Sequence, residues 1–204
     1  MGVILIGLAA WFAMLPEPYN SKETKPENLL LEIIDNSRYI STDEIAQNLI
    51  DNDYILLVDV RTPEEFAAYR LPGSMNIPLS DLLAENEDGG LKWASVFNQT
   101  ARKVVFYSNG SIYSGQAWLL ARRINVKNIY VMQGGLNLWF ETIINPTAPD
   151  QSASDADFAR YNTRRAASMH FTGGGTPAEA GKSENAAPPV ILNNTKPKQE
   201  EGGC

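Results

Sequence analysis

Short apolar runs alternate with amphipathic stretches along the central part of the chain. Tyr54–Val60 and Val104–Tyr107 are largely apolar and rich in β-branched and aromatic residues, which is typical of buried strands. The second run leads into the polar loop Ser108–Tyr113 and then into an amphipathic stretch. Apolar residues there follow the i, i+3, i+4, i+7 spacing of a core-facing helix, at Ala117, Leu120, Ala121 and Ile124. The pattern predicts a strand, a tight loop and a helix.

Helix-start signals place further elements around these strands. Ser41 and Glu44 have the spacing of a capping box, as do Thr62 and Glu65 with proline between them. Tyr39–Ile40 reads as a short strand, and 81–98 reads as a looser connection that turns at Gly89 and Gly90. The repeated strand–helix order predicts an α/β fold with a mostly parallel central sheet flanked by helices on both faces.

The chain divides into five segments by composition. Residues 1–15 are an apolar signal or anchor segment, and 16–37 are a polar spacer followed by a short helix from Pro26. We expect that helix to have an apolar edge, formed by Leu30, Ile33 and Ile34. Residues 38–145 form the α/β domain and 146–171 a helical extension. In that extension we expect the residues packed on the domain to be Phe158, Tyr161 and Ala166. The tail 172–204 has a composition typical of disorder and ends in Gly-Gly-Cys.

The apolar N-terminal segment predicts a membrane anchor or export. Gly2–Leu15 is uninterrupted by charge but shorter than the roughly 20 residues of a spanning helix. It fits a signal-peptide core, although Lys and Arg are missing from its start. A cleaved signal, an uncleaved anchor and a start further upstream all stay open. We expect the domain on the outer, periplasmic side of a membrane, with a cytoplasmic location as the alternative.

Composition excludes several classes of function. The 204 residues carry a formal net charge of −7, which argues against nucleic acid or an anionic membrane surface as the main partner. The single cysteine, Cys204, rules out disulfides within the chain and a cysteine-based metal cluster. We expect no metal and no cofactor.

The loop Ser108–Tyr113 is the candidate site. A loop at the carboxyl end of a parallel strand, opening a helix, is where α/β proteins bind ligands, and its N–H groups favour an anion. Its members are Ser108, Asn109, Gly110, Ser111, Ile112 and Tyr113. Asn109 and Gly110 suit positive φ values. Ser111 and Ser114 either donate hydrogen bonds to a bound anion or cap the helix, and we favour capping. The loop contains no cysteine, histidine, lysine or arginine.

Four segments in the right order resemble the rhodanese domain. They are DVRTPEEF from Asp59, LPGSMNIP from Leu71, the loop itself, and GGLNLW from Gly134, and the resemblance covers residues 38–144. It implies the rhodanese fold. In an active member the loop begins with a cysteine that carries sulfur as a persulfide and ends with an arginine.

The resemblance places Ser108 at the cysteine position and Tyr113 at the arginine position. A serine hydroxyl is a much weaker nucleophile than a thiolate and needs a neighbouring base. Tyr113 supplies no positive charge for an anion. The sequence therefore predicts a domain that has lost sulfur transfer at this loop.

The other polar and aromatic candidates have a structural interpretation. We expect the Asp59 carboxylate to accept hydrogen bonds from nearby backbone. Arg61 either pairs with a carboxylate of the following helix or points toward the loop, and we favour the pairing. Arg70 is expected at the surface, and Trp118 and Trp139 in core or rim packing rather than as ligand platforms.

Three functions remain after this reading. The first is an anion-, ligand- or protein-binding module without sulfurtransferase activity at the loop, which is not an enzyme. The second is a sulfurtransferase or sulfur carrier that uses Cys204 in place of the missing loop cysteine. The third is a phosphatase-like hydrolysis at Ser108, which lacks a visible base, metal or loop arginine.

Overall fold

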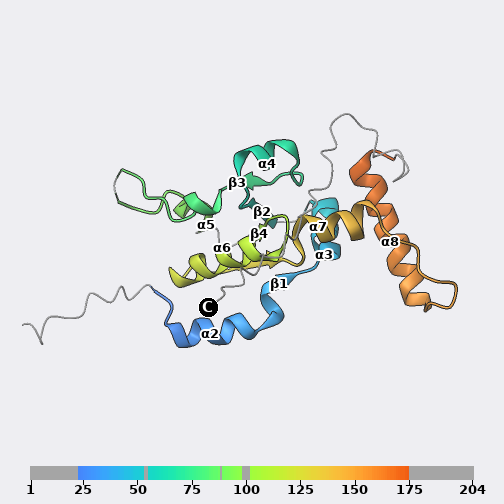
Figure 1. The fold of residues 1–204 in the computed structure, drawn as a ribbon, viewed down its shortest axis with the longest axis horizontal. Coiled ribbons are helices and arrows are strands. Elements are labelled where there is room, and N and C mark those ends of the chain that lie inside the picture. The colour runs from blue at the N-terminus through green and yellow to red at the C-terminus, as the bar shows by residue number, and fades with distance from the viewer. Residues whose placement is uncertain (1–22, 53–54, 88, 98–101, 175–204) are drawn as a thin grey trace, which may run out of the picture.

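A five-stranded parallel sheet organises the protein (Figure 1). The computed structural model describes residues 23–52, 55–87, 89–97 and 102–174. The strands are β1 (Tyr39–Ile40), β2 (Ile55–Asp59), β3 (Met75–Asn76), β4 (Lys103–Tyr107) and β5 (Ile129–Met132), in the spatial order β1-β5-β4-β2-β3. Every pairing is parallel, so the carboxyl ends of all five strands lie at one edge. The predicted α/β fold with a parallel sheet is confirmed.

Helices and short helical turns connect and cover the strands. They are α2 (Pro26–Ile34), η1 (Asn36–Arg38), α3 (Thr42–Asp51), α4 (Pro63–Ala68), η2 (Leu79–Asp81), α5 (Ala94–Phe97), α6 (Ser111–Arg123), α7 (Gly135–Trp139), the π-helical turn η3 (Phe140–Ile144) and α8 (Asp155–Thr172). Thr62 caps α4 in a complete capping box with Glu65. Ser41 caps α3 through the Glu44 amide, but the Glu44 carboxylate binds Lys103 instead of closing the box.

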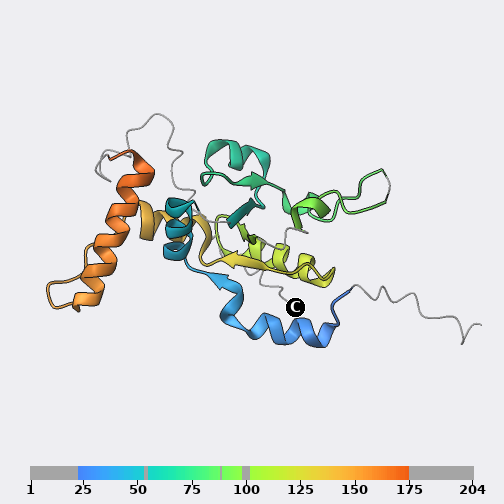
Figure 2. The same cartoon turned by 180° about the vertical axis from the view of Figure 1, so that it is seen from behind.

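Alternate side chains of β4 enter two separate cores, because successive residues of a strand point to opposite faces. Val104 and Phe106 pack with Trp118 and Ala117 of α6, and α5 closes this side. Val105 and Tyr107 pack with α3, α7 and α8 on the other face. Helices therefore cover both faces, as the sequence predicted (Figure 2).

The structure shows which faces of α2 and α8 are buried. On α2 the residue packed against the domain is Leu29, and the predicted apolar edge of Leu30, Ile33 and Ile34 is exposed. On α8 the packed residues are Ala167, Ser168 and Phe171, and Phe158 and Ala166 are exposed. Both sequences carry apolar residues on more than one face, so their periodicity alone does not select the buried one.

The two ends of the chain lie largely outside the described residues. The expected anchor 1–15 lies outside them, as does the expected disordered tail from residue 175 on, including Cys204. Within the described ranges, no helix combines the length and apolarity that crossing a bilayer requires. The helical extension runs from Asp155 to Thr172, and its Ser168 hydroxyl donates a 2.7 Å hydrogen bond to Ile144 O.

Candidate functional site

The candidate loop lies at the carboxyl edge of the sheet, where β2 and β4 end side by side. Asp59 and Tyr107 are register partners at the ends of these strands, so Arg61 and Ser108 leave the sheet next to each other. The loop is shorter than predicted, because α6 begins at Ser111. Ser111, Ile112 and Tyr113 are thus the first turn of the helix.

Two expectations about this loop are wrong. Asn109 and Gly110 do not adopt positive φ; Gly110 is the N-cap of α6 with an extended backbone, φ −130°. Neither Ser111 nor Ser114 caps the helix. Ser111 Oγ instead accepts a hydrogen bond from Gly134 N at 2.9 Å, and the Ser114 hydroxyl donates to Gly110 O at 3.2 Å.

Ser108 is buried and its hydroxyl is engaged within the loop. The residue is 1% exposed, and Oγ donates a 2.5 Å hydrogen bond to Gly110 O. The group facing this oxygen is thus a carbonyl, which is neither a base that could activate a hydroxyl nor a donor that could hold an anion. The Ser108 hydroxyl is thus occupied by a hydrogen bond within the loop itself.

The start of α7 holds the loop in place through its backbone. Leu136 N donates to Ser108 O at 2.9 Å, and Asn137 N donates to Asn109 O at 3.0 Å. Gly135 makes this approach possible, because a Cβ on it would lie 2.8 Å from Gly110 O and closer still to Ser108 O. Sequence reasoning used this glycine pair only as a family signature. The signal for its role was a Gly-Gly pair directly after a strand, where backbone must approach backbone.

Ile112 and Tyr113 point away from the core at the first turn of α6. Their side chains are 75% and 59% exposed. The position at which the rhodanese resemblance expects an anion-holding arginine therefore presents an aromatic ring to solvent, next to an exposed aliphatic side chain. This first turn offers apolar contact area rather than positive charge.

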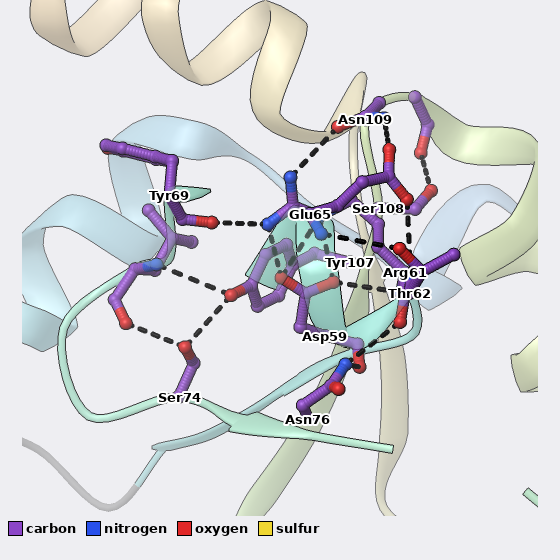
Figure 3. Close-up of polar contacts among 12 residues, drawn as sticks. Asp59, Arg61, Thr62, Glu65, Tyr69, Ser74, Asn76, Tyr107, Ser108 and Asn109 are labelled. Carbon is purple, nitrogen blue, oxygen red and sulfur yellow. Dashed lines mark hydrogen bonds and ion pairs between the residues drawn. The ribbon is translucent and has the colours of Figure 1, made fainter. Parts of the chain in front are cut away.

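Arg61 lies at the centre of the polar contacts beneath the loop (Figure 3). Its Nη2 is 2.6 Å from Asp59 Oδ2, and its Nε donates to both carboxylate oxygens of Asp59. Its other contacts are Tyr69 O at 2.5 Å and Asn109 Oδ1 at 3.2 Å. Burial by itself lowers the pKa of Arg61, but the hydrogen bond and the charge of Asp59 outweigh it and raise that pKa.

This arrangement corrects the prediction for Arg61. Its carboxylate partner is Asp59 at the end of the preceding strand, not a residue of the following helix. The guanidinium also reaches the loop, through Asn109, so the two alternatives are combined. Asp59 accepts the Arg61 amide at 2.9 Å, as expected of a backbone-bonded carboxylate. The positive charge of Arg61 is therefore paired with a buried carboxylate of the same domain.

Asn109 and Tyr107 tie neighbouring segments to the same edge. Asn109 Nδ2 donates to Glu65 Oε1 at 2.7 Å, which fixes the loop to α4. The Tyr107 hydroxyl donates to Ser74 Oγ at 2.9 Å. Burial, together with the charge of Asp59, raises the pKa of Tyr107 well above its ordinary value.

The remaining candidates lie away from the loop or in the core. Trp118 and Trp139 are buried and Arg70 is exposed over the Phe66 ring, as predicted. His170 lies on α8. In the described ranges, no three His, Cys, Asp or Glu residues gather closely enough to hold a metal ion.

Comparison with known proteins agrees with the fold. The profile of the rhodanese-like domain matches residues 41–142, half of the chain. The chain is 28% identical over 107 residues to the uncharacterized protein YqhL of Bacillus subtilis, covering 50% of this chain and 78% of that protein. It is 24% identical over 111 residues to a sulfurtransferase of Allochromatium vinosum, covering 54% of this chain and 95% of that protein.

Two solved structures are also similar to part of the chain. The human single-domain sulfurtransferase TSTD1 is 26% identical, with a TM-score of 0.42, covering 52% of this chain and 98% of that one. A rhodanese-related protein from Thermoplasma volcanium is 23% identical, with a TM-score of 0.41, covering 50% of this chain and 90% of that one. With its parallel sheet and its matched profile, the chain belongs to the rhodanese-like domain family.

Proposed function

We propose that this rhodanese-like domain transfers no sulfur at its loop and acts there as a protein-binding module. The observation that carries the proposal is the state of Ser108, whose buried hydroxyl donates to Gly110 O instead of facing a base. The Arg61 guanidinium does not replace the missing charge, because it is bound by Asp59, Tyr69 and Asn109. The nucleophile and the anion-holding charge are both missing at the position given by the resemblance.

The test of the missing chemistry is thiosulfate:cyanide sulfurtransfer, measured in a Cys204→Ser background so that no other thiol contributes. We expect no turnover for Ser108. We expect Ser108→Cys with Tyr113→Arg to accept sulfane sulfur at least about tenfold above that background, because a helix N-terminus and a nearby cation favour a thiolate. Intact mass after exposure to thiosulfate gives the readout.

Turnover in the Cys204→Ser protein that disappears on Ser108→Ala would contradict the proposal. A folded double variant that stays unlabelled would show that the backbone around Gly110, and not only two side chains, prevents sulfur loading. Circular dichroism of each variant separates that result from misfolding.

The binding surface proposed is the first turn of α6, because Ile112 and Tyr113 place exposed apolar area where the resemblance expects a charged group. A photo-crosslinking amino acid at Tyr113 should give a discrete cross-linked product in cells. The matched control is the same amino acid at Leu83, another exposed apolar residue, in the connection between η2 and α5. Equal products at both positions, or none at either, would contradict a specific surface at α6.

Sulfur transfer by Cys204 is the alternative function. Its support is that Cys204 is the only thiol in the chain and that the relative in Allochromatium vinosum is named a sulfurtransferase. Persulfide labelling followed by peptide mapping tests it. Label on Cys204 that transfers to cyanide faster than from a free Gly-Gly-Cys peptide would favour this function over the binding module.

We also propose that residues 1–15 tether the domain to a membrane or direct its export. The support is the uninterrupted apolar stretch Gly2–Leu15, followed at once by Pro16 and a polar spacer. Cell fractionation with mass analysis of the N-terminus tests it. Recovery of the unprocessed chain wholly in the cytosol would contradict it.

A further inference from the structure

The helix α2 presents aliphatic side chains on two opposite sides. Leu29 is buried against the domain, and Ile33, one turn on, lies on the same side. Leu30, Leu31 and Ile34 are 61%, 63% and 69% exposed. Leu30 and Ile34 are four residues apart and Leu31 and Ile34 three apart, so the three form one outward face. Exposed aliphatic side chains that gather on one face of a helix are typical of a surface that contacts a partner or a membrane.

The inner side of α2 is fixed firmly to the domain, so its outer side is held in one orientation. Glu32 forms a two-pronged ion pair with Arg122 of α6, with Arg122 Nε 2.6 Å from Oε2. The pKa of Glu32 is lowered, and the largest cause is the hydrogen bond from Arg122. In both overall views α2 lies at one edge of the molecule, beside α6 (Figures 1 and 2).

A hollow with positive charge adjoins the outward aliphatic face. It is lined by Lys25, Asn28, Leu31, Arg122, Asn125 and Lys127, together with Glu23, Thr24 and Glu32. Arg122 and Glu32 bind each other, and Glu23 pairs with Arg123. The ammonium groups of Lys25 and Lys127 form no ion pair with any residue in the described ranges. Leu31 borders both the hollow and the aliphatic face.

We propose that this outward face of α2 lies on the surface of a phospholipid bilayer, with Leu30, Leu31 and Ile34 among the acyl chains and Lys25 and Lys127 at lipid phosphates. The proposal rests on the membrane tether by residues 1–15. Aliphatic side chains beside lysines are the composition that lies in a membrane interface. The phosphate is present in zwitterionic lipids, so the chain's net charge of −7 does not oppose the contact.

The length of chain before α2 places this face within reach of a bilayer. Residues Pro16–Lys25 connect the apolar segment to α2 and number ten. Fully extended they span at most about 35 Å. A segment 2–15 held in the membrane would therefore keep α2 close to the lipid surface. The tether raises the local concentration of α2 at the bilayer, so that even a face of three aliphatic side chains can bind there.

The experiment uses the full chain reconstituted into phosphatidylcholine vesicles, with an environment-sensitive fluorophore on a single cysteine. The probe is attached to Leu31→Cys in a Cys204→Ser background, and the matched control is attached to Leu83→Cys. We expect the probe at 31 to be quenched by brominated lipid at least about threefold more than by aqueous iodide. The probe at 83 should show the reverse preference.

Three results would overturn the proposal. Iodide quenching at both positions would leave α2 in solvent even though the chain is anchored. Protection at 31 from both quenchers would show that residues 2–15 or a second copy covers the face. Failure of the chain to associate with vesicles would remove both the tether and the surface contact. None of these results bears on sulfur transfer at Ser108, which the activity assay decides separately.

A variant links the contact to the named side chains. With Leu30→Ser, Leu31→Ser and Ile34→Ser, the chain should stay anchored through residues 1–15, while a probe placed on Asn28→Cys becomes at least about threefold more accessible to iodide than in the parent. The substituted residues are exposed, so the fold should be retained, and circular dichroism checks this. Unchanged accessibility would overturn the role of these three side chains.

Discussion

At the residue scale, the carboxyl edge of the sheet is a set of satisfied polar groups. Arg61 and Asp59 form a buried ion pair whose remaining hydrogen bonds go to the Tyr69 carbonyl and the Asn109 side chain. A buried ion pair is tolerated when its other donors and acceptors are also paired, which is the case here. These groups fix the loop to β2 and α4, and the charge of Arg61 is paired with that of Asp59.

Tyr107 makes stability depend on pH at the alkaline end. Its pKa in the folded protein is raised, chiefly by burial, above the ordinary value of 10.0. A raised pKa means that the unfolded chain loses its proton first, so stability is unaffected below pH 10 and falls as pH rises toward the folded pKa. Between pH 8 and pH 11 the free energy of unfolding should fall in both proteins. The fall should be about 1.4 kcal/mol smaller in Tyr107→Phe than in the wild type.

Urea unfolding at the two pH values measures this difference. At pH 8 the variant should be less stable by about 1 kcal/mol, because it lacks the hydrogen bonds to Ser74 and Leu71. Equal alkaline losses in both proteins would show that Tyr107 ionises as easily when folded as when unfolded. Tyr69, whose pKa is also raised by burial, accounts for alkaline sensitivity that remains in the variant.

At the element scale, the junction between the loop and α7 depends on a residue without a side chain. Gly135 has φ +59° and its Cα faces the backbone of Ser108 and Gly110. The amides of Leu136 and Asn137 are thereby brought to the carbonyls of Ser108 and Asn109. The position of the candidate loop is thus set by a backbone contact between segments some 25 residues apart.

Gly135→Ala should destabilise the protein by about 3 kcal/mol, from backbone strain at positive φ and the clash with loop carbonyls. Chemical denaturation gives the free energy of unfolding. The matched control is Gly115→Ala in α6, where an added Cβ meets nothing within 4 Å. That control should be more stable by about 0.5 kcal/mol, since alanine favours a helix. Similar effects at both positions would contradict the close approach at Gly135.

At the scale of the whole molecule, the helix after the matched segment completes the second core. Phe171 of α8 packs edge-on against Trp139 of α7, with ring centroids 5.1 Å apart, and Arg164 pairs with Asp43 of α3. The profile match ends at residue 142, yet Ala167 is buried in the cluster that contains Trp139. We infer that α8 unfolds together with the sheet.

Phe171→Ala should lower the free energy of unfolding by about 2 kcal/mol, because it leaves Trp139 without its ring contact. Far-ultraviolet ellipticity and tryptophan fluorescence should shift to lower denaturant together. Met169→Ala on the exposed side of α8 is the control and should change stability by less than about 0.5 kcal/mol. Separate transitions for the two probes would show that α8 is an independent element.

The sequence by itself determined the α/β class, the strands β2 and β4, the capped starts of α3 and α4, and the position of the candidate loop. These follow from local apolar periodicity and from cap residues three positions apart, which act within a few residues of chain. The tertiary structure decided which faces of α2 and α8 are buried and that Arg61 binds Asp59. It also decided that the Ser108 hydroxyl faces a carbonyl, because the path of the loop backbone is set by contacts with α7. The local sequence pattern does not show which distant segments come into contact.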